Sequence, residues 1–236
     1  MTEPLDTTPL PPVLRVFPLT GSLLLPGNFL PLHVFEPRYR NMVEDALASD
    51  QMIGMIQPRQ RGADDLGLPD PYGDAEEVGA MDRPDLYAVG CVGRIDQHRE
   101  MPDGRYVLAL VGVARFRVKE ELDLHRGYRR VSADYEEFES DVEPPPLMDG
   151  GDELLQRLEA FSLRQGMSLD TERIRKLPES ALVNGLAMAL PFAAAEKQAL
   201  LEASPQIRPE VLMTLLDMGL NGNSAEERSL APTDPN

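Results

Sequence analysis

Histidine and cysteine, which often carry nucleophilic and metal chemistry, are scarce in this sequence. It contains three histidines and one cysteine among 236 residues. A single cysteine, Cys91, excludes an intramolecular disulfide and a zinc cluster with Cys-x-x-Cys spacing. A reducing compartment fits this cysteine usage best.

Basic residues are also few. The 23 lysines and arginines are outnumbered by 40 aspartates and glutamates, which gives a formal net charge of −17 and a calculated pI near 4.5. This balance argues against attraction to nucleic-acid phosphates or anionic lipid as the main function. With 42% apolar side chains, the chain can still bury a real core.

Targeting and membrane signals are missing as well. The N-terminus, MTEPLDTTPLPPV, is acidic and proline-rich and lacks the basic region and apolar core of a secretory signal. No uncharged apolar run reaches the roughly 20 residues that a membrane span needs. We therefore expect a cytoplasmic protein.

Short strands and one helix are predicted for the first 58 residues. Residues 13–19 (VLRVFPL) are typical of a strand, and an apolar loop punctuated by proline and glycine leads into a second short strand. From Pro37 onward the apolar residues follow a helical period, which predicts an amphipathic helix of about three turns. QMIGMIQP (51–58) predicts a buried strand.

A long loop and a β-hairpin are predicted next. Residues 59–84 are rich in Gly, Pro and Asp and predict an exposed loop. The segments 86–97 and 105–122 flank a Pro-Asp-Gly turn signal, which predicts a long hairpin. Residues 128–139 are the last predicted strand.

Past a proline run the hydrophobic period becomes helical. Four segments show an apolar stripe, namely 152–165, 179–190, 193–203 and 208–220. They predict a small helical bundle, with Gly219 as a helix C-cap. The expected fold class is α+β, with a β-rich domain over 13–142 and a helical bundle over 143–220. We expect a flexible tail at 1–12 and a disordered tail at 221–236.

The histidines lack the neighbours that metal chemistry requires. His33 and Glu36 stand in H-V-F-E-P, which has no second histidine to complete H-E-x-x-H or H-x-x-E-H. We expect a packed histidine on a strand and a glutamate that favours the start of the helix. His98 and His125 lie beside turn signals and should be solvated. No metal site is predicted.

No nucleophile has a recognisable setting either. The apolar neighbours of Cys91 predict burial and a raised pKa, the reverse of an activated thiolate. Neither G-x-S-x-G nor S-x-x-K occurs in the sequence. Acid/base catalysis by two carboxylates stays open, but among 40 acidic residues no pair stands out. We predict no catalytic residue and no cofactor, and expect the protein not to be an enzyme.

Four arginines, Arg115, Arg117, Arg129 and Arg130, fall on what should be neighbouring strands. In one interpretation they form ion pairs across the strands with nearby acids. The acids within reach are Glu120, Asp134, Glu136 and Glu137. In the other, they form a cationic rim beside an exposed apolar groove that binds an extended peptide, which the 59–84 loop could close.

Three aromatic residues, Phe29, Phe35 and Tyr39, have two interpretations of the same kind. They could anchor a bound peptide, although apolar side chains of this size are more often core. The predicted peptide-binding residues are Arg115, Arg117, Arg129, Arg130, Phe35 and Tyr39.

Several segments occur in an order and at spacings that resemble the Lon protease N-terminal domain, also called the substrate-binding domain. The β part of this resemblance lies in FPL, LLPG, PLHVFEPRYRNMV, YAVGCVGRI, MPDGRYVLALVGVARFRV and YRRVSADY. The helical part lies in LPESALVNGLAMALPFAAAEKQALLEA. Together they cover most of residues 13–220.

The resemblance implies a PUA-like mixed β-barrel followed by a helical bundle, in a protein that recognises unfolded or tagged protein segments. Lon proteases continue into an ATPase module and a Ser-Lys peptidase, yet this sequence has no G-x-x-x-x-G-K-[ST] phosphate loop. Its lysines, Lys119, Lys176 and Lys197, do not resemble the peptidase dyad in context. We therefore expect a stand-alone peptide-binding module, and a separate protease as partner stays open.

Two alternatives from other functional classes also stay open. PUA-like barrels in other families bind RNA, although the net charge of −17 argues against RNA here. An enzyme with a dispersed active site, such as a hydrolase, would leave no local motif for sequence reasoning to find.

Overall fold

A computed structural model of the chain describes residues 9–59, 84–142, 151–168, 170, 174 and 179–221. Its internal contacts divide the chain into two units. The first unit contains the residues up to Glu143 together with Pro191–Glu202, and the second contains Pro144–Leu190 and the residues from Ala203 onward. The predicted tails and the predicted 59–84 loop lie largely outside the described residues.

Six strands build the first unit, in the order β2-β5-β4-β3-β1-β6. They are β1 (Val13–Pro18), β2 (Phe29–Val34), β3 (Met52–Ile56), β4 (Val89–Glu100), β5 (Tyr106–His125) and β6 (Tyr128–Asp134). Because β6 pairs with both β1 and β5, the strands β1, β3, β4, β5 and β6 close into a ring. β1 and β3 are parallel and the other pairs are antiparallel, so the sheet is mixed.

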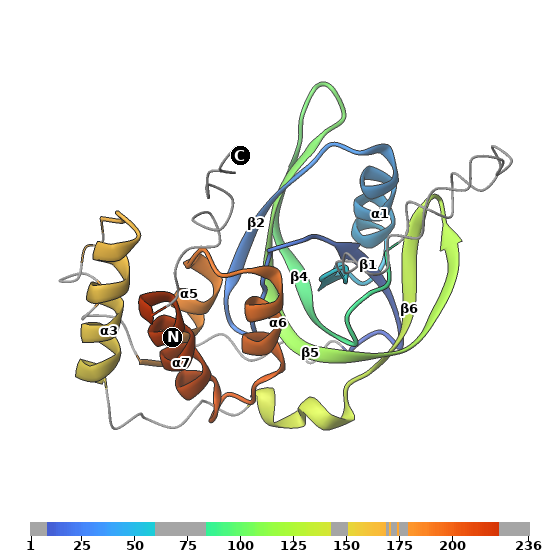
Figure 1. The fold of residues 1–236 in the computed structure, drawn as a ribbon. Coiled ribbons are helices and arrows are strands. Elements are labelled where there is room, and N and C mark those ends of the chain that lie inside the picture. The colour runs from blue at the N-terminus through green and yellow to red at the C-terminus, as the bar shows by residue number, and fades with distance from the viewer. Residues whose placement is uncertain are drawn as a thin grey trace, which may run out of the picture. The chain divides into compact units, whose positions relative to one another are not determined.

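β5 can pair with three neighbouring strands because it is 20 residues long. Its first part pairs with β2 and β4, and its last part pairs with β6. Register shifts between Val92 and Gly93 and between Ile95 and Gln97 mark bulges in the β4–β5 hairpin, which bend a strand and increase its twist. Figure 1 shows β5 curving from the hairpin tip toward β6.

The interior of the ring is apolar. Its buried cluster consists of Leu14, Val16, Met52, Ile56, Val92, Phe116, Val131 and Ala133. Phe116 is fully buried, and an ideal Cβ placed on Gly90 would lie 2.5 Å from its Cζ atom. The ring therefore needs glycine at position 90 to make room for the aromatic side chain of β5.

Helix α1 (Pro37–Leu47) begins at Pro37 and runs for about three turns, as predicted, and its apolar stripe is buried. The β5–β6 turn is tied to this helix through Asp45, which accepts hydrogen bonds from Arg126 Nη1 at 2.5 Å and from Tyr128 Oη at 2.8 Å. Burial would raise the pKa of Asp45, but the hydrogen bonds from Tyr128 and Arg126 outweigh burial and lower it.

The last strand is shorter than predicted. β6 ends at Asp134, and Glu136–Val142 form a 3-10 helix, η2, instead of continuing the strand to residue 139. The Asp134 Oδ1 atom accepts a hydrogen bond from the backbone N–H of Glu136 at 3.0 Å. A short acidic side chain that bonds the backbone two residues later favours a turn over an extended strand.

Helices α3 (Gly151–Arg164), α5 (Glu179–Ala189) and α7 (Arg208–Asn221) belong to the second unit. α3 packs on α7, where Arg157 Nε pairs with Asp217 Oδ1 at 3.0 Å. The predicted C-cap at Gly219 is wrong, because α7 continues to Asn221 and position 219 lies within it. An ideal Cβ at Gly219 would lie 2.5 Å from Phe161 Cε2, so close packing of α3 on α7 accounts for this glycine.

Helix α6 (Ala194–Glu202) lies within the predicted helical bundle in sequence, but its contacts group it with the strands of the first unit. The domain boundary between residues 142 and 143 and the arrangement of α3, α5 and α7 as a bundle stay predictions. None of the described helices is long and apolar enough to cross a membrane.

Candidate functional site

Arg115 is buried rather than exposed at the surface, with only 3% of its area accessible. Its Nη1 atom donates to the carbonyl oxygens of Leu201 at 3.1 Å and Glu202 at 3.0 Å, at the end of α6. Its guanidinium carbon lies 4.6 Å from the ring centroid of Phe138. A cation at the C-terminus of a helix satisfies carbonyls that have no partner within the helix and favours the helix dipole. Arg115 therefore holds the end of α6 against β5.

Two buried glutamines hold the rest of α6. Gln57 Nε2 donates to the carbonyl of Ala194 at 2.9 Å, and Gln198 Nε2 donates to the carbonyl of Val89 at 3.1 Å. The Oε1 atom of Gln57 also accepts from the backbone N–H of Gly21 at 3.0 Å. We call Gln57, Arg115 and Gln198 the α6 clasp. Sequence reasoning missed both glutamines, because a single amide at the end of a strand or within a helix carries no signal of its partner.

Arg117 lies two residues beyond Arg115 on the same face of β5 and reaches solvent. It forms a bidentate pair with Glu137, at 2.7 Å from Nε and 2.6 Å from Nη2. Hydrogen bonding and the positive charge of Arg117 lower the pKa of Glu137. Pairing with Glu137 is one of the ion pairs that the first interpretation of the arginines proposed.

Arg129 and Arg130 project from opposite faces of β6, because neighbouring residues of a strand alternate. Arg129 shares the face of Val131, its side chain is 11% exposed, and it pairs with Glu121 at 2.5 Å. Arg130 contacts the carbonyl of Asp123 at 3.3 Å. Asp134, which lies opposite Arg117, is five residues from Arg129, or roughly 17 Å along the strand. The structure therefore does not gather the four arginines around one exposed surface, and peptide binding by any of them stays a prediction.

The aromatic candidates separate into a buried residue and two exposed ones. Tyr39 is 7% exposed and its ring centroid lies 4.2 Å from that of Phe17, so it belongs to the core. Phe29 and Phe35 are 61% and 64% exposed. The expectation that both phenylalanines are core is wrong, because both project from the outer side of β2 and the residue that follows it.

Among the histidines, the prediction for His33 is wrong, because the side chain is exposed on β2 rather than packed. His98 and His125 are exposed as predicted, and His125 Nε2 lies 3.6 Å from Asp45 Oδ2. Cys91 is fully buried, also as predicted. Within the described ranges, no group of three or more His, Cys, Asp or Glu side chains could hold a metal ion.

Comparison with known proteins identifies a family for most of the chain. The family model of the ATP-dependent protease La (LON) substrate-binding domain matches residues 13–217. The chain is 34% identical over 111 residues to Lon protease 2 of Myxococcus xanthus, covering 47% of this chain and 12% of that protein. It is 28% identical over 213 residues to Lon protease 2 of Sorangium cellulosum, covering 86% of this chain and 24% of that protein. The chain thus spans a quarter or less of the length of these relatives.

Solved structures agree with this assignment. A Lon N-terminal domain protein from Xanthomonas campestris matches with a TM-score of 0.55 and 25% identity, covering 86% of this chain and 97% of that one. The N-terminal domain of a Mycobacterium avium complex Lon protease shares the fold with a TM-score of 0.55 at 18% identity. The chain belongs to the family of Lon protease substrate-binding domains.

Proposed function

We propose that the protein is a non-enzymatic module that binds unfolded or tagged segments of other proteins. The observation that carries this proposal is the match of the substrate-binding domain model to residues 13–217. The sequence adds that the phosphate loop and the peptidase dyad expected of a complete Lon protease are missing from these 236 residues. We further propose that the module works in the cytoplasm and that its partners include a separate protease.

We also make a proposal about the architecture of the two units. We propose that the closed five-strand ring is a PUA-like barrel and that α3, α5 and α7 form a helical bundle over most of 143–220. Mixed strand pairing around the ring and the packing of α3 on α7 support this view.

Of the predicted peptide-binding residues, we keep those whose side chains a client could reach. Phe35 is 64% exposed, and the Arg117 side chain is 45% exposed while paired with Glu137. Arg115 differs from these residues, because a client could contact its guanidinium group only if the end of α6 first moved away from it. We therefore assign Arg115 to the α6 clasp rather than to a binding surface.

Binding can be tested with reduced, carboxymethylated α-lactalbumin, which stays unfolded in buffer, as a fluorescent probe. We expect saturable binding with a dissociation constant in the micromolar range, and no binding of native, folded α-lactalbumin. A single-stranded RNA of similar length serves as a second control, because RNA binding would weaken steeply with added salt. Failure to bind the unfolded probe up to the solubility limit of the protein would contradict the proposal.

A further inference from the structure

The side chains of strand β2 form two rows, one buried in the core and the other exposed. It lies at the end of the strand order and, among the described strands, pairs only with β5. Leu32 and Val34 are buried, whereas Phe29, Pro31 and His33 are exposed. Packing in the core accounts for the buried row. It does not account for a large aromatic side chain, Phe29, in the exposed row.

The exposed row of β2 continues across β5 and β4 as one sheet face. Residues directly opposite each other in an antiparallel pair project to the same face. Phe29 is opposite Val111, which is opposite Arg94, and farther along the hairpin Val107 is opposite Arg99. We call these three rows the β2–β5–β4 outer face. Small apolar side chains on β5 lie between the β2 row and the β4 row. The β2 row consists of Phe29, Pro31 and His33, and the β4 row consists of Arg94, Gln97 and Arg99.

The backbone of β2 also leaves hydrogen-bonding groups at its edge. Both backbone groups of Gly112 on β5 bond the chain leading into β2: its N–H donates to the carbonyl of Asn28 at 2.9 Å, and its carbonyl accepts from the N–H of Gly27 at 2.9 Å. Bonded and non-bonded positions alternate, so Phe29, Pro31 and His33 direct their backbone groups away from β5. Proline at position 31 therefore costs the ladder no hydrogen bond.

The strand register assigns two arginines and no acidic residue to the outer face. Arg94 and Arg99 are the charged residues that the strand register places on this face, in a chain of net charge −17. Glu100 is opposite Tyr106 and so lies on the other face, and Asp96 falls in the bulge, outside the register. Charges more than a Debye length apart, about 8 Å at physiological salt, are largely screened. The electrostatic energy of a charged group bound at the outer face therefore depends more on these two arginines than on distant acidic residues.

We propose that the β2–β5–β4 outer face binds an extended segment of a partner protein in which apolar and acidic residues alternate. Side chains of an extended segment alternate between its two sides. A segment lying along β5 would direct apolar side chains toward Phe29 and carboxylates toward Arg94 and Arg99. A second copy of the chain is the weaker candidate, since two molecules of net charge −17 repel each other. This inference rests on the protein-binding function proposed above and specifies the class of segment.

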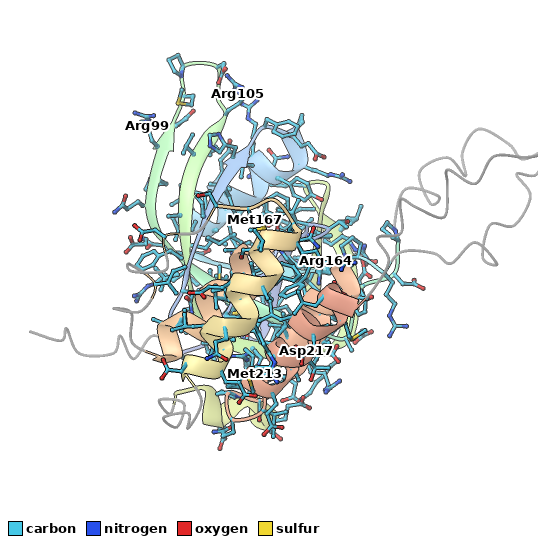
Figure 2. All side chains as sticks on the ribbon, turned by 60° about the vertical axis from the view of Figure 1, so that its left-hand side comes forward. Arg99, Arg105, Arg164, Met167, Met213 and Asp217 are labelled. Carbon is cyan, nitrogen blue, oxygen red and sulfur yellow. The ribbon has the colours of Figure 1, made fainter. Side chains whose placement is uncertain are left out.

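Three fluorescein-labelled peptides test the proposal on the full chain by fluorescence anisotropy: (Val-Glu)4, (Val-Lys)4 and (Ser-Glu)4. We expect (Val-Glu)4 to bind best, and Phe29→Ser or Arg99→Glu to weaken it about tenfold or more. The matched controls, Leu163→Ser and Arg164→Glu, change an exposed leucine and an arginine of α3 in the second unit and should have no effect. Figure 2 labels Arg99 near the tip of the β4–β5 hairpin and Arg164 on α3.

The charge reversal also predicts a gain of binding, which a misfolded variant could not produce. Arg99→Glu should bind (Val-Lys)4 more tightly than the unaltered protein does. Equal affinity of the unaltered protein for the acidic and basic peptides would overturn the proposal, and so would unchanged (Val-Glu)4 binding in both outer-face variants. A dimer in sedimentation that Phe29→Ser converts to monomer would also overturn it, by making the face a self-association surface.

The inference and the proposed function can fail separately. If the unaltered protein binds unfolded α-lactalbumin but not (Val-Glu)4, clients bind elsewhere and only the outer-face proposal is overturned. If neither probe binds, both proposals fail. Loss of both probes in Phe29→Ser, with both retained in Leu163→Ser, would support the outer face as the surface where clients bind.

Discussion

Replacing Arg115 by alanine removes the central member of the α6 clasp, and the structure lets the cost be estimated. The substitution leaves the Leu201 and Glu202 carbonyls without this donor and removes the guanidinium from the face of Phe138. An unsatisfied buried polar group costs about 1–3 kcal/mol, so the two carbonyls cost about 2–6 kcal/mol, and a desolvated cation–π contact contributes roughly 1–2 kcal/mol more. Partial access of water to the helix end lowers the sum, so we expect a loss of about 3–5 kcal/mol in the free energy of unfolding.

Arg117→Ala is the matched control, because Arg117 lies two residues away on the same strand face. It forms an exposed ion pair, whose loss should cost only about 0–1 kcal/mol. Urea unfolding followed by circular dichroism measures both free energies. Thermal unfolding should show a drop of roughly 6–20 °C for Arg115→Ala. If the two variants unfold within about 1 kcal/mol of each other, the clasp does not contribute as the geometry indicates.

Four further predictions concern two glycines and the tie between the β5–β6 turn and α1. Gly90→Ala should destabilise the protein by about 1–3 kcal/mol in urea, because its Cβ would lie 2.5 Å from Phe116 Cζ. Gly185→Ala in α5, with no heavy atom within 4 Å of the new Cβ, should instead stabilise by about 0.5–1 kcal/mol. The pKa of Asp45 is lowered on folding, so its contribution is present above the unfolded value near 4 and is lost as pH falls through the folded value. Asp45→Asn should therefore flatten the acid limb of stability against pH, and an unchanged limb would contradict this reasoning. Burial and the hydrogen bond to Asp45 raise the pKa of Tyr128 to about 12, so its contribution is complete below about pH 10 and is lost as pH rises toward the folded value. Burial also raises the pKa values of Tyr106 and Tyr135, so ultraviolet titration of Tyr128→Phe should show one late-ionising tyrosine fewer than the unaltered protein.

Features set by local sequence were predicted well. The helical period after Pro37 identified the start and approximate length of α1, since an amphipathic stripe and a proline at the first turn act within a few residues. The Pro-Asp-Gly signal likewise identified the β4–β5 hairpin. Closure of the ring depends instead on β6 pairing with β1, more than 100 residues earlier in the chain, and no local pattern encodes that pairing.

The site was harder to predict, because exposure depends on distant packing. Arg115 follows an alternating pattern with Arg117 that is typical of a solvent face, yet α6, some 80 residues later, covers it. Phe29 and Phe35 are hydrophobic enough to suggest core positions, yet they are exposed on and just beyond an edge strand. In each case the deciding neighbour is remote in sequence.

Whether a residue is buried, as Arg115 is, or exposed, as Phe29 is, decides whether its substitution can test binding. Arg115→Glu would place a carboxylate against the Leu201 and Glu202 carbonyls, and repulsion between these groups would separate the end of α6 from β5. Loss of client binding in that variant would reflect disruption of the α6 clasp. It would not show that Arg115 contacts the client. Phe29 and Arg99 are exposed, so changing them leaves the core and the clasp intact. A binding defect confined to such variants, with an unchanged free energy of unfolding, can therefore be assigned to the surface itself.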